Sequence, residues 1–269
     1  MAQHRPKRWL GQTFLVDGNL QRKIVESLNL EPGDRVLEIG PGRGALTRHL
    51  AGRCKALFLV ELDRDLARDL EEEFGGLPGV RVINEDILRL HPGQLTDRVG
   101  DLKVVGNIPY NITTPILFHL LGRPRPLEIV LMVQKEVGER IMASPGTPEF
   151  GALTVGVGSV AQVERVLEVP ASAFRPVPKV DSVVLRIRPT RPEPLSPEEE
   201  EALRSLTRLA FQKRRKQFQA ILRGHPDTAL SHEQVRELEV ITGFDLRRRP
   251  ETFSPEDFVL LSRELGKLA

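Results

Sequence analysis

The sequence predicts an α/β fold with a parallel sheet, followed by a small all-helical C-terminal domain. Three observations lead to this prediction. Short apolar runs alternate with helical stretches between residues 35 and 133, a Pro-rich segment interrupts the chain near residue 190, and the remainder has helical periodicity without a convincing strand. Strands that alternate with helices are typical of a parallel sheet covered on both faces.

Length and composition limit the possible classes. A chain of 269 residues corresponds to one large or two modest domains. With 40% hydrophobic and 28% charged residues and a net charge of +2, the chain is neither disordered nor strongly basic. Any nucleic-acid site must therefore be a local patch. The single cysteine, Cys54, excludes a disulfide framework, and no histidine pair has metal-ligand spacing.

The N-terminal segment and the apolar runs of the chain predict its cellular location. No apolar run is long enough to span a membrane. The basic start, Met1–Trp9, lacks the apolar segment that a secretory signal would need. We therefore expect a cytoplasmic monomer with no metal ion and no membrane partner.

Individual elements follow from these patterns. Buried strands are expected at Arg35–Ile39, Ala56–Leu62, Val80–Asn84, Leu102–Gly106 and Leu127–Val133. Helices are expected at Ala45–Arg53, Arg64–Phe74 and Thr114–Leu121. The Val-rich stretches Leu153–Val169 and Val180–Ile187 are interpreted as late strands of the same sheet, with antiparallel pairing allowed.

The domain division rests on the Pro-rich segment. Residues 1–188 form the expected sheet domain, with a basic arm at residues 1–10. Residues 189–197, which contain four prolines, form a stiff linker. Residues 198–269 form the helical domain. Ser196, near the end of the linker, is the expected N-cap of its first helix, and Glu198–Glu201 lie near the positive end of that helix.

A glycine-rich loop, Val36–Gly44, lies at a strand-to-helix junction. Glycines at such a junction let the backbone approach a ligand, and the following helix offers free N–H groups. Gly40, Gly42 and Ala45 also fit the G-x-G-x-x-A pattern of dinucleotide-binding proteins, so the loop alone does not decide the cofactor.

Two carboxylates narrow the choice. Glu61 ends the next strand, 21 residues after Gly40, where a carboxylate accepts hydrogen bonds from ribose hydroxyls. Asp86 follows the third strand and can accept a hydrogen bond from an adenine amino group. Asp63 is interpreted as a solvated acid at a helix start. Because the carboxyl ends of adjacent parallel strands meet at one edge, these residues predict a nucleoside-containing cofactor.

The turn Asn107-Ile108-Pro109-Tyr110 ends the fourth strand. Proline disfavours helix for the residue before it and donates no backbone hydrogen bond. The side-chain oxygen of Asn107 and the carbonyl of Pro109 can therefore accept from an amino group on a flat ring. Tyr110, the only tyrosine, can stack on that ring.

This turn, extended to Ile112, resembles the ribosomal RNA adenine dimethyltransferase family. Further segments are similar to blocks of that family: Arg8–Leu15, Leu37–Gly42, Val133–Val137, Phe150–Val155, Phe174–Ser182 and Phe211–Lys216. The resemblance implies a Rossmann-like methyltransferase domain that uses S-adenosylmethionine and releases S-adenosylhomocysteine. It also implies dimethylation of the exocyclic amino groups of two adjacent adenosines near the 3′ end of small-subunit ribosomal RNA, with a role in subunit maturation.

The resemblance also carries over individual residues. It assigns Asn107, Pro109 and Tyr110 to catalysis, and to cofactor binding it assigns Thr13, Leu15, Gly40, Gly42, Glu61, Asp86 and Asn107. One position departs from the family pattern, which has Asn where this chain has Thr13. Thr13 cannot make the side-chain amide contact of that Asn, while it keeps a hydroxyl and a backbone carbonyl.

The RNA partner requires a local basic surface. We expect phosphate contacts from the basic arm, Arg5–Arg8, and from a helical C-terminal domain that recognises RNA. Phe174 is expected to help stack the base, and the expected cationic contacts are Lys213, Arg214, Arg215 and Lys216, placed on a helix, together with Arg247 and Arg248. Trp9 either stacks on RNA or packs on the domain.

Three alternatives remain open at this point. A methyltransferase of the same family could act on large-subunit ribosomal RNA. A ribosome-assembly factor could keep the fold without needing catalysis. A dehydrogenase would fit the glycine loop, but the Asn-Ile-Pro-Tyr turn supplies no acid or base for hydride transfer.

Overall fold

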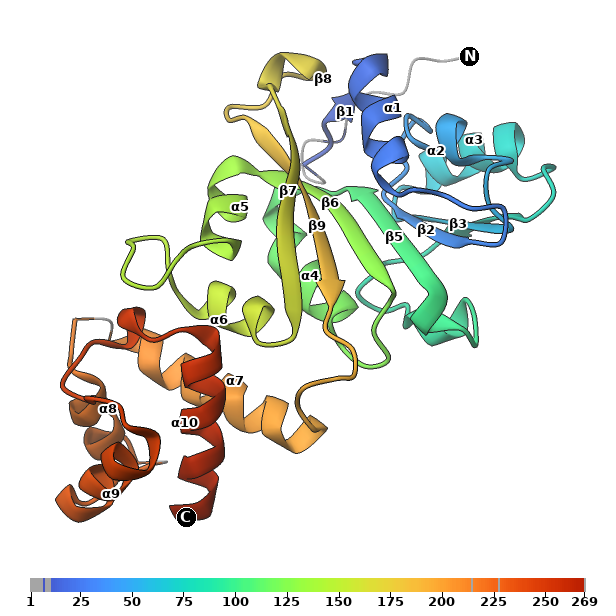
Figure 1. Cartoon of the computed structure of the whole chain (residues 1–269). Coiled ribbons are helices and arrows are strands. Elements are labelled where there is room, and N and C mark those ends of the chain that lie inside the picture. Colours follow the sequence, from blue (N-terminus) through green and yellow to red (C-terminus); the bar gives the residue numbers. More distant parts are fainter. Residues whose placement is uncertain (1–6, 8–10, 214, 227, 269) are drawn as a thin grey trace. The chain divides into compact units, whose positions relative to one another are not determined.

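The computed structural model describes residues 7, 11–213, 215–226 and 228–268, and the chain divides into two compact units (Figure 1). The sheet unit comprises Met1–Gly138 and Val163–Pro189, and the helical unit comprises Glu139–Gln162 and Thr190–Ala269. The change of unit at Pro189 falls within one residue of the expected boundary. Residues 139–162, which the sequence placed with the sheet, group instead with the C-terminal helices.

A seven-stranded sheet in the order β4-β3-β2-β5-β6-β9-β7 organises the sheet unit. Its parallel part consists of β2 (Arg35–Ile39), β3 (Ala56–Glu61), β4 (Val80–Asn84), β5 (Leu102–Asn107) and β6 (Glu128–Gln134). β9 (Ser182–Pro189) is antiparallel to β6, and β7 (Ala161–Val169) lies at the edge. The strand order reverses beside β2, where open α/β sheets bind ligands.

Helices and short 3-10 turns connect these strands. The helices are α1 (Gly18–Ser27), α2 (Thr47–Leu50), α3 (Arg64–Phe74), α4 (Thr113–Leu120) and α5 (Lys135–Ile141), which crosses the unit boundary. The turns are η2 (Pro92–Gln94), η3 (Val99–Asp101), η4 (Tyr110–Ile112) and η5 (Ala171–Ala173). α2 is shorter than expected because the backbone of Ala51 leaves the helical region at ψ 130°.

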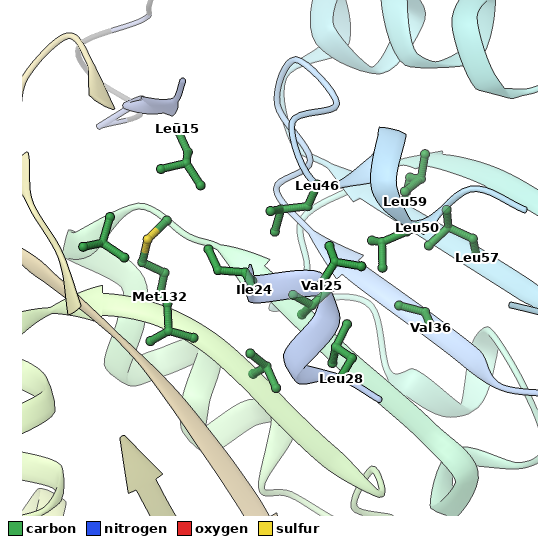
Figure 2. Close-up of a cluster of buried hydrophobic side chains, with 14 of the residues drawn as sticks. Leu15, Ile24, Val25, Leu28, Val36, Leu46, Leu50, Leu57, Leu59 and Met132 are labelled. Atoms are coloured by element: carbon green, nitrogen blue, oxygen red, sulfur yellow. The ribbon is translucent and has the colours of Figure 1, made fainter. Parts of the chain in front are cut away.

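One core of the sheet unit lies between α1 and the sheet. Figure 2 shows Ile24 and Val25 of α1, and Leu28 at its C-cap, among the apolar side chains of the strands. Each of these three side chains is at most 2% exposed, so the apolar face of α1 is sealed against β2 and its neighbours. Burial of this apolar surface is the main stabilising contribution to the platform that carries the loops.

A two-stranded sheet secures the N-terminal segment. β1 (Phe14–Leu15) pairs antiparallel with β8 (Phe174–Arg175), and Val16 N donates to Ala173 O at 2.8 Å. Leu15 and Phe174 belong to the same buried cluster as α1. The segment before α1 is therefore fixed by both backbone pairing and apolar contact.

The helical unit consists of α6 (Ala152–Gly158), α7 (Pro197–Gln212), α8 (Phe218–Gly224), α9 (His232–Thr242), η6 (Pro250–Thr252) and α10 (Pro255–Leu268). The expected cap of α7 is confirmed, since Ser196 and Glu199 form reciprocal side-chain to backbone hydrogen bonds. Aromatic pairs 5.5–6.1 Å apart fill the interior, formed by Phe150, Phe211, Phe218, Phe244, Phe253 and Phe258.

The predicted strand Leu153–Val169 is wrong in its first half, because Ala152–Gly158 form α6. The Thr154 hydroxyl accepts from Gly151 N and donates to Arg140 O at 2.6 Å, which fixes the first turn of this helix. Leu153, Val155 and Val157 are buried, so packing outweighs the preference of β-branched residues for strands. Within the described part of the chain, no helix combines the length and the apolar character needed to cross a membrane.

Candidate active site

A cavity of about 220 Å³ lies at the carboxyl ends of β2, β3, β4 and β5. Its walls come from the N-terminal segment at residues 11–15, the glycine loop, the ends of the strands and the turn after β5. The structure brings all seven expected cofactor residues to this cavity: Thr13, Leu15, Gly40, Gly42, Glu61, Asp86 and Asn107. Their contact with a cofactor stays a prediction, but their convergence is observed.

The glycine loop adopts a conformation that favours glycine. Gly40 and Gly42 have φ angles of +64° and +58°, in the left-handed region. A Cβ on Gly42 would stand 3.1 Å from the Phe14 ring, which would have to shift by a few tenths of an ångström. The left-handed backbone at Gly40 and Gly42 therefore favours glycine at this wall of the cavity.

Glu61, at the end of β3, is 6% exposed and is held by two backbone groups. Its Oε2 accepts from Gly42 N at 3.0 Å, and its Oε1 accepts from Asp63 N at 2.9 Å. Burial raises the pKa of this carboxyl, while the two backbone hydrogen bonds act in the opposite direction. Carboxylate oxygens have further lone pairs, so Glu61 can still accept from a pair of hydroxyls.

Glu38 lines the same cavity, and sequence reasoning did not select it. It is 1% exposed, and its Oε2 accepts from the Thr47 hydroxyl at 2.7 Å. Burial raises the pKa of Glu38 to about 8, with a further contribution from the charge of Glu61. The signal in the sequence was an acidic residue inside an apolar strand, directly before the glycine loop.

Asp86 follows β4 and is half-buried at the cavity wall. Its Oδ1 accepts from Leu88 N at 3.0 Å, which closes a local turn. The carboxylate keeps further acceptor capacity, as recognition of an amino group requires. Ile87, next to it, is buried and supplies an apolar surface to the cavity.

Asp63 caps α3, as expected of an acid at a helix start, but it is not solvated. Its side chain has no exposed surface and accepts from Lys7 Nζ at 2.6 Å and from Gln12 Nε2 at 2.9 Å. Burial acts to raise the pKa of Asp63, but the hydrogen bonds from Lys7 and Gln12 outweigh it and the pKa falls. Asp63 thus anchors the N-terminal segment that lines the cavity.

The turn after β5 presents two acceptors. Asn107 Nδ2 donates to Thr13 O at 3.3 Å, which leaves the side-chain oxygen of Asn107 able to accept. The carbonyl of Pro109 accepts from Ile112 N at 3.2 Å and retains a second lone pair. Both Asn107 and Pro109 line the cavity, so the acceptors stand at its edge.

The two aromatic residues expected to stack on the base lie differently. Tyr110 is half-buried, is not a cavity-lining residue, and its hydroxyl is 2.6 Å from Ser182 Oγ. Its stacking role stays a prediction. The expectation for Phe174 is wrong in this structure, because that side chain is 0% exposed within the core. Phe174 is buried because it lies in β8 and packs as the apolar partner of β1.

The first basic segment lies in a turn and not on the expected helix. α7 ends at Gln212, and Lys213 has non-helical angles of φ −130° and ψ 52°. Lys213, Arg215 and Lys216 are exposed, while Arg214 lies outside the described residues. Lys216 N donates to Lys213 O at 2.9 Å, so the turn is closed by its own backbone.

A second basic turn is joined to the first within the helical unit. Phe218 N, at the start of α8, donates to Arg248 O at 2.9 Å. Arg247 and Arg248 are exposed, and Arg247 pairs with Asp245 at 2.9 Å. We call Lys213, Arg215, Lys216, Arg247 and Arg248 the basic patch. Arg5, Arg8 and Trp9 lie outside the described residues.

Metal and thiol chemistry have little support in the described part of the chain. No three His, Cys, Asp or Glu side chains there are grouped as metal ligands. Cys54 is half-buried, and burial raises the pKa of its thiol to about 11. A thiol with a raised pKa is a poor nucleophile.

Comparison with known proteins gives consistent matches. The model of a family described as "Ribosomal RNA adenine dimethylase" matches residues 3–252. The "Ribosomal RNA small subunit methyltransferase A" of Acinetobacter baylyi is 41% identical over 264 residues, covering 97% of this chain and 93% of the relative.

Two solved structures share the whole fold. A dimethyladenosine transferase from Plasmodium falciparum is 26% identical, with a TM-score of 0.78 over 94% of this chain and 98% of that one. The 23S rRNA methyltransferase ErmE is 31% identical, with a TM-score of 0.71 over 94% of this chain and 99% of that one.

Proposed function

The chain belongs to the ribosomal RNA adenine dimethylase family, and from this premise we propose that it dimethylates two adjacent adenosines near the 3′ end of small-subunit ribosomal RNA. The methyl groups come from S-adenosylmethionine, and S-adenosylhomocysteine is released. One observation carries the proposal: Asn107 and Pro109 line the same cavity as the residues expected to bind the cofactor.

The residues of the cavity fit S-adenosylmethionine. Glu61 has acceptor capacity for the ribose hydroxyls, and Asp86 has it for the adenine amino group. The glycine loop leaves room for a ligand against the backbone, since a Cβ on Gly42 would crowd the Phe14 ring. When bound, this cofactor supplies an electrophilic methyl group on a sulfonium centre.

The turn after β5 can activate a weak nucleophile. The lone pair of an adenine amino nitrogen is delocalised into the ring. In the first transfer, hydrogen bonds from its two N–H groups to Asn107 Oδ1 and Pro109 O draw the nitrogen toward tetrahedral geometry and free the lone pair. The methylated nitrogen then loses one proton to water, and in the second transfer the single remaining N–H bonds to one of the two oxygens. The same oxygens stabilise the positive charge that grows on nitrogen, so catalysis rests on positioning and electrostatics.

The RNA partner follows from the same geometry. An adenine in a duplex must leave the stack to reach Asn107, which costs a few kcal/mol, whereas loops and ends reduce that cost. We propose that the helical unit recognises RNA, with the basic patch contacting phosphates. A monomer acting in the cytoplasm on the small subunit during its maturation is part of this proposal.

The second candidate is methylation of large-subunit RNA, which the likeness to ErmE favours. The small-subunit assignment has more support, because the relative with 41% identity bears the small-subunit name and the identity to ErmE is 31%. A binding factor without catalysis has less support, since Glu61, Asp86 and Asn107 all meet at one cavity.

The deciding experiment supplies labelled S-adenosylmethionine to small ribosomal subunits that lack the modification, with digestion to nucleosides. We expect about two dimethyladenosines per subunit. Transfer to large subunits alone would support the second candidate, methylation of large-subunit RNA. Donor binding without transfer to either subunit would indicate a binding factor without catalysis.

Asn107→Ala tests the mechanism within the same assay. Loss of an acceptor that stabilises transition-state charge should reduce kcat by about 10²–10³-fold. Asn19→Ala, at the exposed start of α1, is the matched control and should keep the wild-type rate. A wild-type rate for purified, folded Asn107→Ala would refute the role of the turn.

A further inference from the structure

A buried side-chain hydroxyl holds the hydroxyl of Tyr110, which lies 2.6 Å from Ser182 Oγ. The two residues are 72 positions apart in sequence, and Ser182 begins β9. The residue expected to orient the target base is therefore fixed by a contact from outside its own turn.

Ser182 is itself rigidly placed. It is 0% exposed, and in the sheet register it lies opposite Gln134 of β6. Lys135 N donates to the carbonyl of the preceding residue, Asp181, at 3.0 Å. A buried hydroxyl requires a partner, and the partner of Ser182 is Tyr110. The side chain is thus a fixed support that does not line the cavity.

The other functional residue of the turn, Asn107, is also held from outside the turn, because its Nδ2 donates to the carbonyl of Thr13 at 3.3 Å. Asn107 and Tyr110 are therefore each fixed by a hydrogen bond to a distant part of the chain, Asn107 to Thr13 and Tyr110 to Ser182.

We propose that Ser182 is a positioning residue for methyl transfer, acting through the hydroxyl of Tyr110 to set the ring against which the target adenine stacks. This inference rests on the proposed function. A displacement of about 1 Å of a group that orients the substrate costs on the order of 10²-fold in rate. Loss of the Ser182 hydroxyl should accordingly lower kcat, although Ser182 touches neither the donor cavity nor the turn acceptors.

The first test is spectroscopic, because the chain has a single tyrosine. In protein carrying ¹³C-labelled tyrosine, one NMR signal reports on Tyr110 alone. Burial raises the pKa of Tyr110, and the hydrogen bond with Ser182 opposes that rise. Ser182→Ala should therefore shift the signal at pH 7 and raise the pKa further. An unchanged signal and an unchanged titration would overturn the proposal.

The second test is a double-mutant cycle on methyl transfer, with Ser182→Ala, Tyr110→Phe and the double variant. Each single variant should lower kcat by about tenfold, the value of one hydrogen bond. The double variant should be no slower than the worse single variant, because both remove the same contact. Donor affinity, measured by calorimetry, should stay unchanged. Fully additive losses would show that the two hydroxyls act independently and would refute the proposal.

Ser27→Ala is the matched control for a lost serine hydroxyl. Ser27 lies in α1, where its Oγ donates to Ile24 O at 2.7 Å. This variant should leave both the tyrosine signal and kcat unchanged. If the wild-type protein methylates neither ribosomal subunit, the proposed function fails, while the tyrosine signal still reports whether Ser182 holds Tyr110.

Discussion

Glu38 and Glu61 are two buried carboxyl groups on neighbouring strands, and their partners differ. Glu61 accepts from two backbone N–H groups, whereas the hydroxyl of Thr47 is the side-chain donor to Glu38. Burial raises the pKa of both carboxyls, and it raises that of Glu38 to about 8, so Glu38 carries a proton at neutral pH.

The raised pKa of Glu38 makes stability depend on pH. The folded state binds the proton more tightly than the unfolded state, whose carboxyl has a pKa near 4.5. The stabilisation is fully present below 4.5, and it is lost as the pH rises toward 8 and above. Urea unfolding measures this effect. Between pH 6 and pH 9 the free energy of unfolding should fall more for wild type than for Glu38→Gln.

The exposed Glu26 provides the control for this measurement, since Glu26→Gln should keep the wild-type pH dependence. Equal pH slopes for wild type and Glu38→Gln would show that Glu38 is ionised at neutral pH.

The candidate site contains residues that the sequence predicts and contacts that it does not. The seven expected cofactor residues converge because parallel strands in register bring their carboxyl ends to one edge. The contact between Tyr110 and Ser182 joins residues 72 positions apart and has no local pattern. Phe174 was predicted to stack on the base, but it is buried in the core, and the sequence does not reveal which aromatic residues are buried.

At the scale of elements, the N-terminal segment is attached at three places. Lys7 and Gln12 reach Asp63 at the start of α3, Thr13 reaches the turn after β5, and β1 pairs with β8. Residues 11–15 of this segment line the cavity. Donor affinity should therefore depend on a residue, Asp63, that does not line the cavity.

Asp63→Asn isolates this attachment, because asparagine also caps helices and preserves the start of α3. The variant loses the ion pair with Lys7 and should weaken donor affinity by up to about tenfold, a range that partly exposed ion pairs can reach. Calorimetric titration with S-adenosylmethionine measures the change.

Asp69→Asn, on the exposed face of the same helix and paired with Arg68, is the control and should bind as wild type. Wild-type affinity for Asp63→Asn would mean that β1 and Thr13 hold the segment without help from Lys7.

Prediction of elements succeeded where burial dictates the pattern. Arg35–Ile39 was predicted at its observed bounds, because a central strand covered on both faces is a nearly continuous apolar run. Val80–Asn84, the edge strand of the sheet, was also predicted at its observed bounds, although Val80 is its one buried residue. The same continuity misled at Leu153–Val169, where an apolar run does not distinguish a buried helix from a strand. The hydroxyl of Thr154 and the packing of its neighbours decide for helix.

At the scale of the whole molecule, charge is concentrated while the net charge is only +2. Hydrogen bonds at the start of α8 bring two basic turns together within the helical unit. The sequence indicated both turns but placed the first on a helix, because a run of charges carries no sign of where α7 ends. RNA affinity should therefore depend on salt through this patch.

Replacing Lys213, Arg215 and Lys216 with glutamine should lower RNA affinity at every sequence tested. The slope of log K against log salt should fall by about 0.7 for each phosphate of single-stranded RNA that is no longer neutralised. Filter binding at several salt concentrations measures both quantities. Replacing Arg68 and Arg98, which are exposed in the sheet unit, is the control and should leave the slope unchanged. If the triple variant has the same slope as wild type, the basic patch does not contact RNA.

The hydrogen bond from Asn107 to the carbonyl of Thr13 couples the donor cavity to the turn proposed to hold the target base. The segment at residues 11–15 forms a wall of the donor cavity and also orients Asn107, so the two binding sites share this segment. A ligand that steadies this wall favours the other ligand, and thermodynamic linkage requires the benefit to be equal in both directions. RNA should then tighten the binding of each form of the cofactor by the same factor by which that form tightens the binding of RNA.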